Sequence, residues 1–286
     1  MIELRDIHYL RLGTCDLDAA EDYCTRVLGL QLVVKKDHAL YFRSDHRHHT
    51  LCYFAGDSRD HTVGFELQDW RGLDRALGAL DAAGVPCGSG APEEAAERFV
   101  HDFGWFNDPS GNRIELLVRP FEANRRYFPA RDAGVKGFGH IGLNTTDPER
   151  DEAFWTTHFN ARVSDWIGPT PLLRVASRHH QLALFPTDRP GVQHVNYQVQ
   201  EIDDLMRSWY WFQEIEIPIV FGPGRHCTSG GYFLYFEGPE GMIYEYSNSD
   251  RSIIEDEASY RPRQFAMEAA SFCAFGSKPN IKEFSE

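Results

Sequence analysis

The chain has 286 residues, enough for two ordinary domains, and its 42% hydrophobic and 25% charged residues are typical of a globular protein. The formal net charge of −14 argues against nucleic-acid binding, because contact with phosphates needs a basic face. The first residues have no signal-peptide pattern, and no apolar run approaches the roughly 18 residues that cross a bilayer. We therefore expect a cytoplasmic protein with no membrane partner.

Two segments far apart in the chain begin in the same way. Residues 9–16 (YLRLGTCD) and 140–147 (HIGLNTTD) each have the pattern of a short strand that ends in Thr-x-Asp. A helical segment follows each of them, over 17–30 and 148–163. The Asp is a predicted N-cap in both copies, and Pro148 suits the first helical position of the second.

Two further pairs of segments repeat in the same order. HTVGFELQ (61–68) and HVNYQVQ (194–200) are predicted strands that lead into helices. These helices are expected over 69–84 and 201–215. WFNDPSGNRIE and YFEGPEGMIYE, which end at Glu115 and Glu245, align without a gap. Each predicts a β-hairpin with a Pro-x-Gly turn.

The repeats predict an α+β fold of two tandem modules. Each module is a pair of βαβββ units that form a cupped, incomplete β-barrel with helices outside. The first module is expected over 1–125 and the second over 126–250, with the polar segment 121–137 as linker. The tail 251–286, rich in Arg, Pro and acidic residues, is expected to wrap the surface or an oligomer interface.

The second module carries three residues with metal-ligand chemistry. His140 is on its first strand, His194 on the first strand of its second half, and Glu245 on its last strand. Two imidazoles and a carboxylate suit a facial triad on ferrous iron, and side chains from neighbouring strands can converge inside a cupped sheet. A lone strand histidine is more often a core or surface residue, so the pattern alone leaves both interpretations open. The repeat symmetry of the second module favours the metal site.

These residues and their surroundings resemble the two-module type I extradiol dioxygenases of the vicinal oxygen chelate superfamily. The matching stretches are GFGHIGLNTTD (137–147), RHHQLALFP (178–186), VQHVNYQV (192–199), GPGRHCTSGGYFLYFEGPEG (222–241) and MIYEYS (242–247). The resemblance implies His140, His194 and Glu245 as ligands of Fe(II), with Mn(II) as an alternative that the same donors accept. It also implies a catechol-type substrate and O₂ as partners, and a homo-oligomer, a tetramer or octamer. No organic cofactor is implied, since the chain has no dinucleotide or phosphate-binding loop.

The same resemblance assigns roles to three further polar residues. It makes His179 the acid–base residue beside bound oxygen and leaves the adjacent His180 structural, although a one-residue shift would exchange the two. Tyr235 would hydrogen-bond the catecholate oxygen, and His226 would contact the substrate hydroxyl, with His194 also beside the substrate. From the residues alone, the tyrosine is equally a strand aromatic and the histidine a solvated loop residue.

The first module repeats part of this pattern. His61 and Glu115 align with the second and third ligands, and a double histidine recurs at 48–49. The first ligand is missing because Tyr9 stands in its place, and the neighbouring His8 faces the other way on a strand. We therefore expect no metal in the first module.

Two alternatives to ring cleavage remain open. A glyoxalase-like isomerase or lyase of the same superfamily typically uses a second carboxylate in place of one histidine, which this chain lacks. A non-catalytic protein that binds aromatic ligands would need no triad. For a dioxygenase of aromatic compound degradation, 2,3-dihydroxybiphenyl is the reference substrate, and another substituted, carboxylated or trihydroxylated catechol is an alternative. The cleavage position stays undecided.

Overall fold

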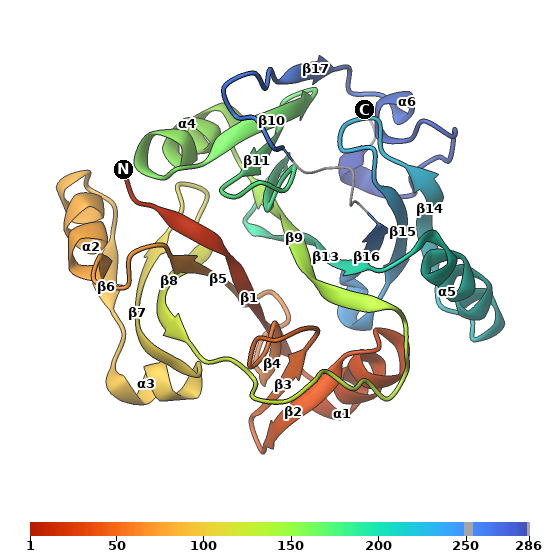
Figure 1. The fold of residues 1–286 in the computed structure, drawn as a ribbon, viewed down its shortest axis with the longest axis horizontal. Coiled ribbons are helices and arrows are strands. Elements are labelled where there is room, and N and C mark those ends of the chain that lie inside the picture. The colour runs from red at the N-terminus through yellow and green to blue at the C-terminus, as the bar shows by residue number, and fades with distance from the viewer. Residues whose placement is uncertain (249–253, 285–286) are drawn as a thin grey trace. The chain divides into compact units, whose positions relative to one another are not determined.

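The computed structural model describes residues 1–248 and 254–284, which divide into two compact units. Unit one contains Met1–Arg131 and Arg150–Ala161, and unit two contains Asp132–Glu149 and the described residues from Arg162 onward (Figure 1). Residues 249–253 and 285–286, at the end of the predicted second module and in the predicted tail, lie outside the described residues. Within the described part, no helix is both long enough and apolar enough to span a bilayer.

Unit one is built on a sheet of eight strands in the order β2-β3-β4-β1-β5-β8-β7-β6. The strands are β1 (Leu4–Thr14), β2 (Gln31–Lys36), β3 (Ala39–Arg43), β4 (Leu51–Ala55), β5 (His61–Leu67), β6 (Cys87–Ser89), β7 (Val100–Asn107) and β8 (Arg113–Pro120). The helices are α1 (Leu17–Asp22), continued by the π-helical turn η1 (Tyr23–Val27), α2 (Leu73–Ala82) and α3 (Pro92–Glu97). The predicted cap of the first helix is confirmed, since the Asp16 side chain accepts from Ala19 N.

Unit two has a sheet of nine strands in the order β14-β15-β16-β13-β9-β12-β11-β10-β17. The strands are β9 (Val135–Thr145), β10 (Arg162–Ile167), β11 (Thr170–Arg174), β12 (Leu182–Pro186), β13 (Gly191–Val199), β14 (Ile219–Arg225), β15 (Tyr232–Glu237), β16 (Ile243–Asn248) and β17 (Arg263–Phe265). The helices that follow β9 in the chain are α4 (Pro148–His158), most of which groups with unit one, α5 (Ile202–Glu214), α6 (Ala269–Phe272) and the short 3₁₀ turns η2 (Pro239–Gly241) and η3 (Lys282–Phe284).

Both sheets are assembled from two copies of one βαβββ unit. In unit one, β1 runs parallel to β4 and antiparallel to β5, which itself runs parallel to β8. In unit two, β9, β12, β13 and β16 pair in the same directions. The predicted α+β fold of paired βαβββ units is therefore confirmed. In unit two the first strands of the two copies, β9 and β13, are neighbours at the centre of the sheet and carry His140 and His194. Glu245 lies on β16, the strand next to β13.

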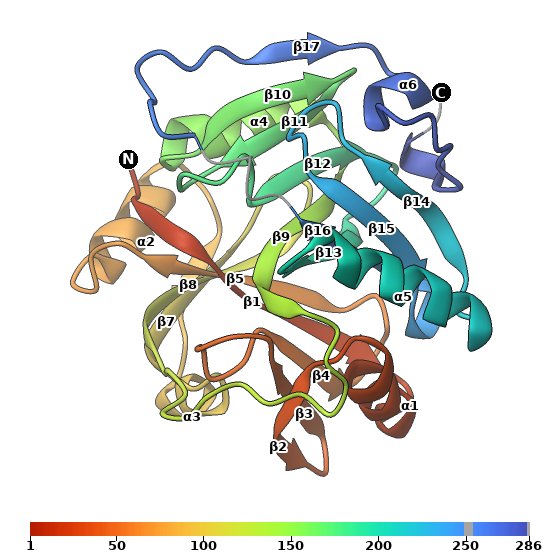
Figure 2. The same ribbon diagram turned by 45° about the vertical axis from the view of Figure 1, so that its right-hand side comes forward.

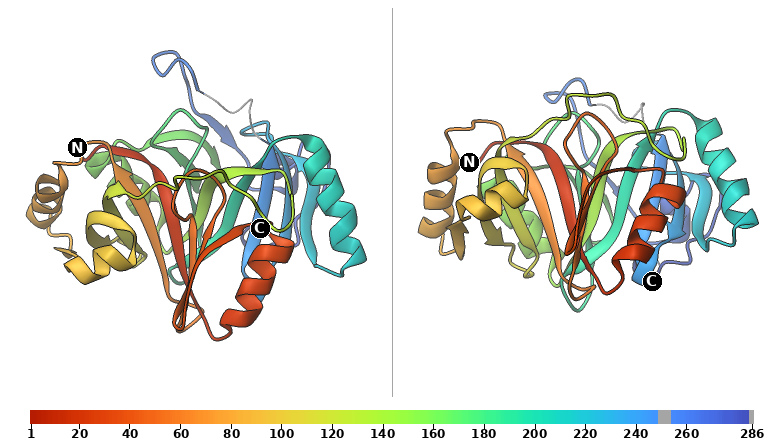
Figure 3. Two further views of the ribbon diagram at one scale, coloured as in Figure 1. Left: turned by 60° about the horizontal axis from the view of Figure 1, so that its bottom comes forward. Right: turned by 90° about the horizontal axis from the view of Figure 1, so that it is seen from below.

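The tail and α4 differ in placement from the predicted boundaries. β17 extends the sheet by running parallel to β10, with Arg263–Phe265 beside Asp165–Ile167 (Figure 2). Residues 150–161, expected in the second module, group with unit one because Trp155 is fully buried there against Phe65. In unit two, α5 packs on β14, β15 and β16 (Figure 3).

Candidate metal centre

Three neighbouring strands of unit two each carry one residue of the predicted ligand set. His140 lies on β9, His194 on β13 and Glu245 on β16, and all three side chains are buried. The Nε2 atoms of the two histidines are 3.0 Å apart. Glu245 Oε2 lies 3.0 Å from His140 Nε2 and 3.6 Å from His194 Nε2. The structure thus brings together three donor atoms of the kinds that a facial triad needs.

The surroundings of His194 direct its Nε2 lone pair toward the other two residues. Its Nδ1 contacts the side-chain oxygen of Gln193, and because an amide oxygen only accepts, Nδ1 carries the ring proton. Burial and His140 lower the pKa of His194 to about 3, so the ring is neutral. Buried Glu245 Oε2 accepts no hydrogen bond of good geometry among the described residues. A cation held by the three side chains would satisfy these atoms together, so the residues fit a divalent metal.

His226 and Tyr235 lie beside Glu245. His226 Nδ1 donates to the backbone carbonyl oxygen of Phe272 at 3.0 Å, and its Nε2 is 3.2 Å from both Glu245 Oε1 and the Tyr235 hydroxyl. Burial raises the pKa of Tyr235 well above its usual value, and Glu245 adds to this, so the phenol stays protonated. Burial alone would raise the pKa of Glu245, but His140 and His226 outweigh it and keep the carboxylate ionised. Both predicted polar residues therefore line the cavity beside the ligands.

The double histidine is arranged differently from the prediction. The ring of His180 packs on His140, with centroids 4.1 Å apart, and lines the same cavity as the ligands. His179 instead directs its Nε2 toward Asp165 Oδ2 at 3.0 Å. Both histidines lie in a bend before β12, outside any strand, so the alternation of faces along a strand does not apply to them. His180 therefore packs against the candidate ligand His140, and both histidines line a second cavity with His140 and Glu245.

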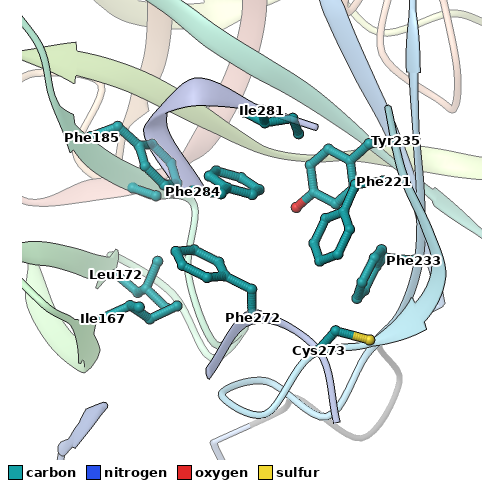
Figure 4. Close-up of a cluster of buried hydrophobic side chains, with 11 residues drawn as sticks. Ile167, Leu172, Phe185, Phe221, Phe233, Tyr235, Phe272, Cys273, Ile281 and Phe284 are labelled. Atoms are coloured by element: carbon teal, nitrogen blue, oxygen red, sulfur yellow. The ribbon is translucent and has the colours of Figure 1, made fainter. Parts of the chain in front are cut away.

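Beyond the ligands the cavity wall is apolar, and the tail supplies part of it (Figure 4). The rings of Phe272 and Phe284 are stacked, with centroids 4.7 Å apart and 9° between their planes. The Phe284 ring also lies 5.7 Å from that of Tyr235 and 6.3 Å from that of His194. The other apolar lining residues are Ile167, Leu172, Ala183 and Phe185. The remaining cavity of about 30 Å³ has room for about two water molecules.

These tail residues were missed by the sequence analysis. Phe272 and Phe284 are 2% and 1% exposed, although the tail as a whole is polar. A signal was available, because single phenylalanines recur through this polar segment. Isolated large apolar side chains of this kind predict burial against a core, but nothing local says which core they reach.

The strand register of unit one corrects the alignment of His61. Arg11 pairs with Thr62 across β1 and β5, as Gly142 pairs with His194 across β9 and β13. Arg11 and Gly142 both lie two residues beyond the first ligand position of their sheets. Thr62, and not His61, therefore holds the position of the second ligand. His61 is half-buried one residue earlier.

The glutamate that unit one retains has partners within the protein. The Tyr9 hydroxyl donates to Glu115 Oε2 at 2.5 Å. Arg98 Nε lies 2.9 Å from both carboxylate oxygens, and Arg98 Nη2 donates to Oε1 at 2.8 Å. Glu115 is fully buried, so this guanidinium supplies the positive charge that the carboxylate requires.

Comparisons with known proteins give one family, and several of the similar proteins are named dioxygenases. Residues 6–116 and 137–246 match the family model described as Glyoxalase/Bleomycin resistance protein/Dioxygenase superfamily. An iron-dependent extradiol dioxygenase of Rhodococcus jostii (strain RHA1) is 29% identical over 279 residues, covering 90% of this chain and 93% of the relative. A 1,2-dihydroxynaphthalene dioxygenase of Sphingobium xenophagum is 25% identical, covering 91% and 93%. The crystal structure of BphC, a halotolerant catechol dioxygenase, superposes with a TM-score of 0.83 at 25% identity, covering 92% of each chain.

Proposed function

The chain belongs to the Glyoxalase/Bleomycin resistance protein/Dioxygenase superfamily, and we propose that it is a non-haem Fe(II) extradiol dioxygenase. The reaction is the cleavage of a catechol-type ring next to the vicinal diol, with both atoms of O₂ entering the product. The observation that carries the proposal is the convergence of His140, His194 and Glu245 in one buried cluster. The named dioxygenases that share this chain's length and fold support the same reaction.

His140, His194 and Glu245 would hold the iron. Two imidazoles and one carboxylate on one side of the ion leave positions for a diol and for O₂. Bound there, ferrous iron supplies a binding point for both reactants and a path for electrons between them. The side-chain oxygen of Gln193 accepts from His194 Nδ1, which holds the ring in the tautomer that binds through Nε2.

The remaining polar residues of the cavity bind the diol and move protons. We assign the acid–base role to His180 because its ring packs against His140 in the cavity, whereas the His179 ring points to Asp165. His180 would accept the proton that leaves one hydroxyl and return it when the O–O bond breaks. Tyr235 and His226 would hold the other substrate oxygen, since both line the cavity next to Glu245.

The apolar wall selects the kind of ring that binds. Among the described residues that line this apolar cavity, none is a lysine or arginine, whereas Arg178 lines the second cavity next to the candidate ligands. A carboxylate substituent directed toward the apolar wall would therefore be buried without a cationic partner, which is unfavourable. The substrate class that fits is an uncharged catechol, either 2,3-dihydroxybiphenyl-like or carrying another apolar substituent. The cavity has room for about two water molecules, so the catechol ring itself enters only when side chains of the wall, Phe284 among them, move.

A glyoxalase-like isomerase is less well supported by the same site. Such enzymes use a second carboxylate as a metal ligand or base. Glu245 is the single carboxylate among the described residues that line the two cavities next to the ligands. Apart from the two histidines of the candidate ligand set, the polar side chains His180, His226 and Tyr235 line the cavity, and they suit proton transfer to and from a phenol and oxygen.

We further propose Mn(II) as an alternative metal, a cytoplasmic location and a homo-oligomer of four or eight chains. The metal alternative follows from the donor set, which binds either ion. Location and assembly rest on the family resemblance. Sedimentation velocity of the full chain tests the assembly, and a monomer at micromolar concentration would contradict it.

The function is tested by loading the chain with Fe(II) without oxygen and then adding air and one of a panel of catechols. Ring fission yields a yellow semialdehyde product, with one O₂ consumed for each diol. The proposal predicts turnover of uncharged catechols and slower turnover of carboxylated ones. Iron bound at the site with no product from any vicinal diol would sink it.

A further inference from the structure

His179 is a buried residue of unit two that has no part in the ligand set. Its Nε2 lies 3.0 Å from Asp165 Oδ2, and its Nδ1 lies 3.1 Å from Nδ1 of His180. His180 in turn packs on His140, with ring centroids 4.1 Å apart. An unbroken row of contacts therefore runs from a carboxylate on β10 to the ring beside the ligands.

The protons in this row follow from what each group can donate. Asp165 is fully buried and accepts from Arg263 through the backbone N at 2.9 Å, Nε at 3.1 Å and Nη2 at 2.6 Å. A carboxylate held by a guanidinium is ionised and only accepts, so His179 Nε2 carries a proton. Burial lowers the pKa of His179, and a neutral imidazole carries only one N–H, which here is on Nε2. His179 Nδ1 is then the acceptor, and His180 Nδ1 is the donor. The lone pair of His180 is left on Nε2.

We propose that Asp165 and His179 are positioning residues that hold His180 in the Nδ1–H tautomer, with its Nε2 lone pair available in the cavity. The inference rests on the proposed function, in which His180 takes a proton from the diol. A ring of the opposite tautomer has its proton on Nε2 and cannot accept another there. Asp165 does not touch the substrate and acts on His180 only through the hydrogen bonds of His179.

Unit one provides an internal comparison for this role. It has the same histidine pair, with Nδ1 of His48 and Nδ1 of His49 3.2 Å apart. At the position of Asp165, however, stands Val34: each is the third residue in the register with the following strand, after the same irregularity. The His48 ring stacks on Phe99 instead, with centroids 3.8 Å apart. The carboxylate thus accompanies the histidine pair in the unit that holds the candidate ligands.

The main test is Asp165→Val, which copies the residue of unit one, in two backgrounds. With His180 present, we expect iron content and catechol affinity to persist and kcat to fall by about ten- to hundredfold. In a His180→Ala background the same change should leave the residual kcat within about twofold, because the two residues act as one. Losses of equal size in both backgrounds would overturn the proposal.

Two variants separate positioning from general damage. Asp165→Asn keeps an oxygen that accepts from His179, so it should retain most of the activity that Asp165→Val loses. Glu257→Gln breaks another ion pair between the tail and the sheet, with Arg174 at 2.6 Å, and should leave kcat unchanged. A loss of kcat in Glu257→Gln as large as in Asp165→Val would overturn the specific role.

A second readout does not need turnover. Long-range ¹H–¹⁵N spectra of the full chain loaded with diamagnetic Zn(II) report which nitrogen of each histidine carries the proton. We expect Nε2–H for His179 and Nδ1–H for His180, with both patterns altered in Asp165→Val. A proton on Nε2 of His180 in the unaltered chain would overturn the proposal. If these tautomers are found but the iron-loaded chain cleaves no catechol, the proposed function fails and the arrangement of the two rings stands.

Discussion

Both units bury a glutamate at the same strand position, and they neutralise it in different ways. Glu115 in unit one is held by Arg98 and Tyr9, which are parts of the chain itself. Glu245 in unit two has histidine neighbours and, among the described residues, no lysine or arginine within ion-pair distance. A guanidinium is a permanent cation, so unit one is complete as folded. Unit two leaves its positive charge to be supplied by an ion.

The two sites also differ in few residues, although only that of unit two has the three donors of a candidate metal centre. The strands, their directions and the glutamate are shared. Tyr9 and Thr62 replace the two histidine ligands, and Arg98 supplies a positive charge at the glutamate. Repeated folding units can therefore keep the packing role of a position while its chemistry changes. The contrast between the units is what the following predictions test.

The largest effect is expected from removal of a ligand. His194→Ala takes away one of three donors, so the iron content of the chain should fall to near zero and turnover by more than about 10³-fold. Thr62→Ala, at the same position of unit one, should change neither. Metal analysis and oxygen consumption measure both. Loss of iron in Thr62→Ala would contradict the conclusion that the position of His194 in unit two corresponds to a metal-free position in unit one.

The next prediction concerns folding stability without metal. Glu115→Gln leaves the partly buried Arg98 without its counter-ion, so the free energy of unfolding should fall by about 3–5 kcal/mol. Glu245→Gln in a chelator removes a buried charge that has no fixed cation, and it should be neutral or stabilising. Denaturant unfolding of the two variants gives the comparison. Equal destabilisation by both changes would contradict the account of how each charge is balanced.

A smaller effect is expected at the tail, which adds an aromatic wall to unit two. Phe284→Ala enlarges the cavity, so kcat/KM for 2,3-dihydroxybiphenyl relative to unsubstituted catechol should rise by about tenfold. The same change should lower stability by about 3–5 kcal/mol, because a buried ring is lost. Phe103→Ala, in a core cluster of unit one, is the matched control and should lower stability without a change in the substrate ratio. An unchanged ratio in Phe284→Ala would remove the tail from substrate selection.

The smallest effect concerns a turn that differs between the units. Burial raises the pKa of Asp108 to about 6, although hydrogen bonds from Asn112 lower it in part. The aligned residue of unit two is Gly238, which has no carboxyl group. Folding therefore favours the protonated carboxyl. Its contribution is complete below about pH 4 and is lost as the pH rises through 6. Relative to Asp108→Asn, the wild type should lose about 2 kcal/mol between pH 4 and pH 7. Urea unfolding at both pH values tests this, and a constant difference would contradict it.

The fold was largely predictable from the sequence because its evidence is local. Strand alternation, the Asp16 cap, Pro148 at the start of α4 and the gap-free hairpins all act within a few residues. Because the chain contains the same unit repeatedly, each of these local patterns occurs more than once, which strengthens the prediction. The convergence of the three candidate ligands could be predicted because the first and last strands of each repeated unit are neighbours in the sheet, as β13 and β16 are.

The rest could not be predicted because it depends on departures from regular structure and on distant contacts. His61 was misaligned since irregularities within β1–β5 and β9–β13 shift the register, which a gap-free reading ignores. The contact of His180 with His140 could not be predicted from strand alternation, because the bend that holds His179 and His180 has no alternating faces. The position of Phe284 depends on where the tail folds back, and no local pattern encodes it.

The central claim is that one metal binds, in unit two, and its most direct test is crystallographic. Anomalous diffraction at the iron edge from crystals of the Fe(II)-loaded chain locates each iron without assumptions about the ligands. The account predicts one peak per chain, within bonding distance of His140, His194 and Glu245. A peak beside Glu115, or none between the three ligands of a chain that cleaves catechols, would contradict it.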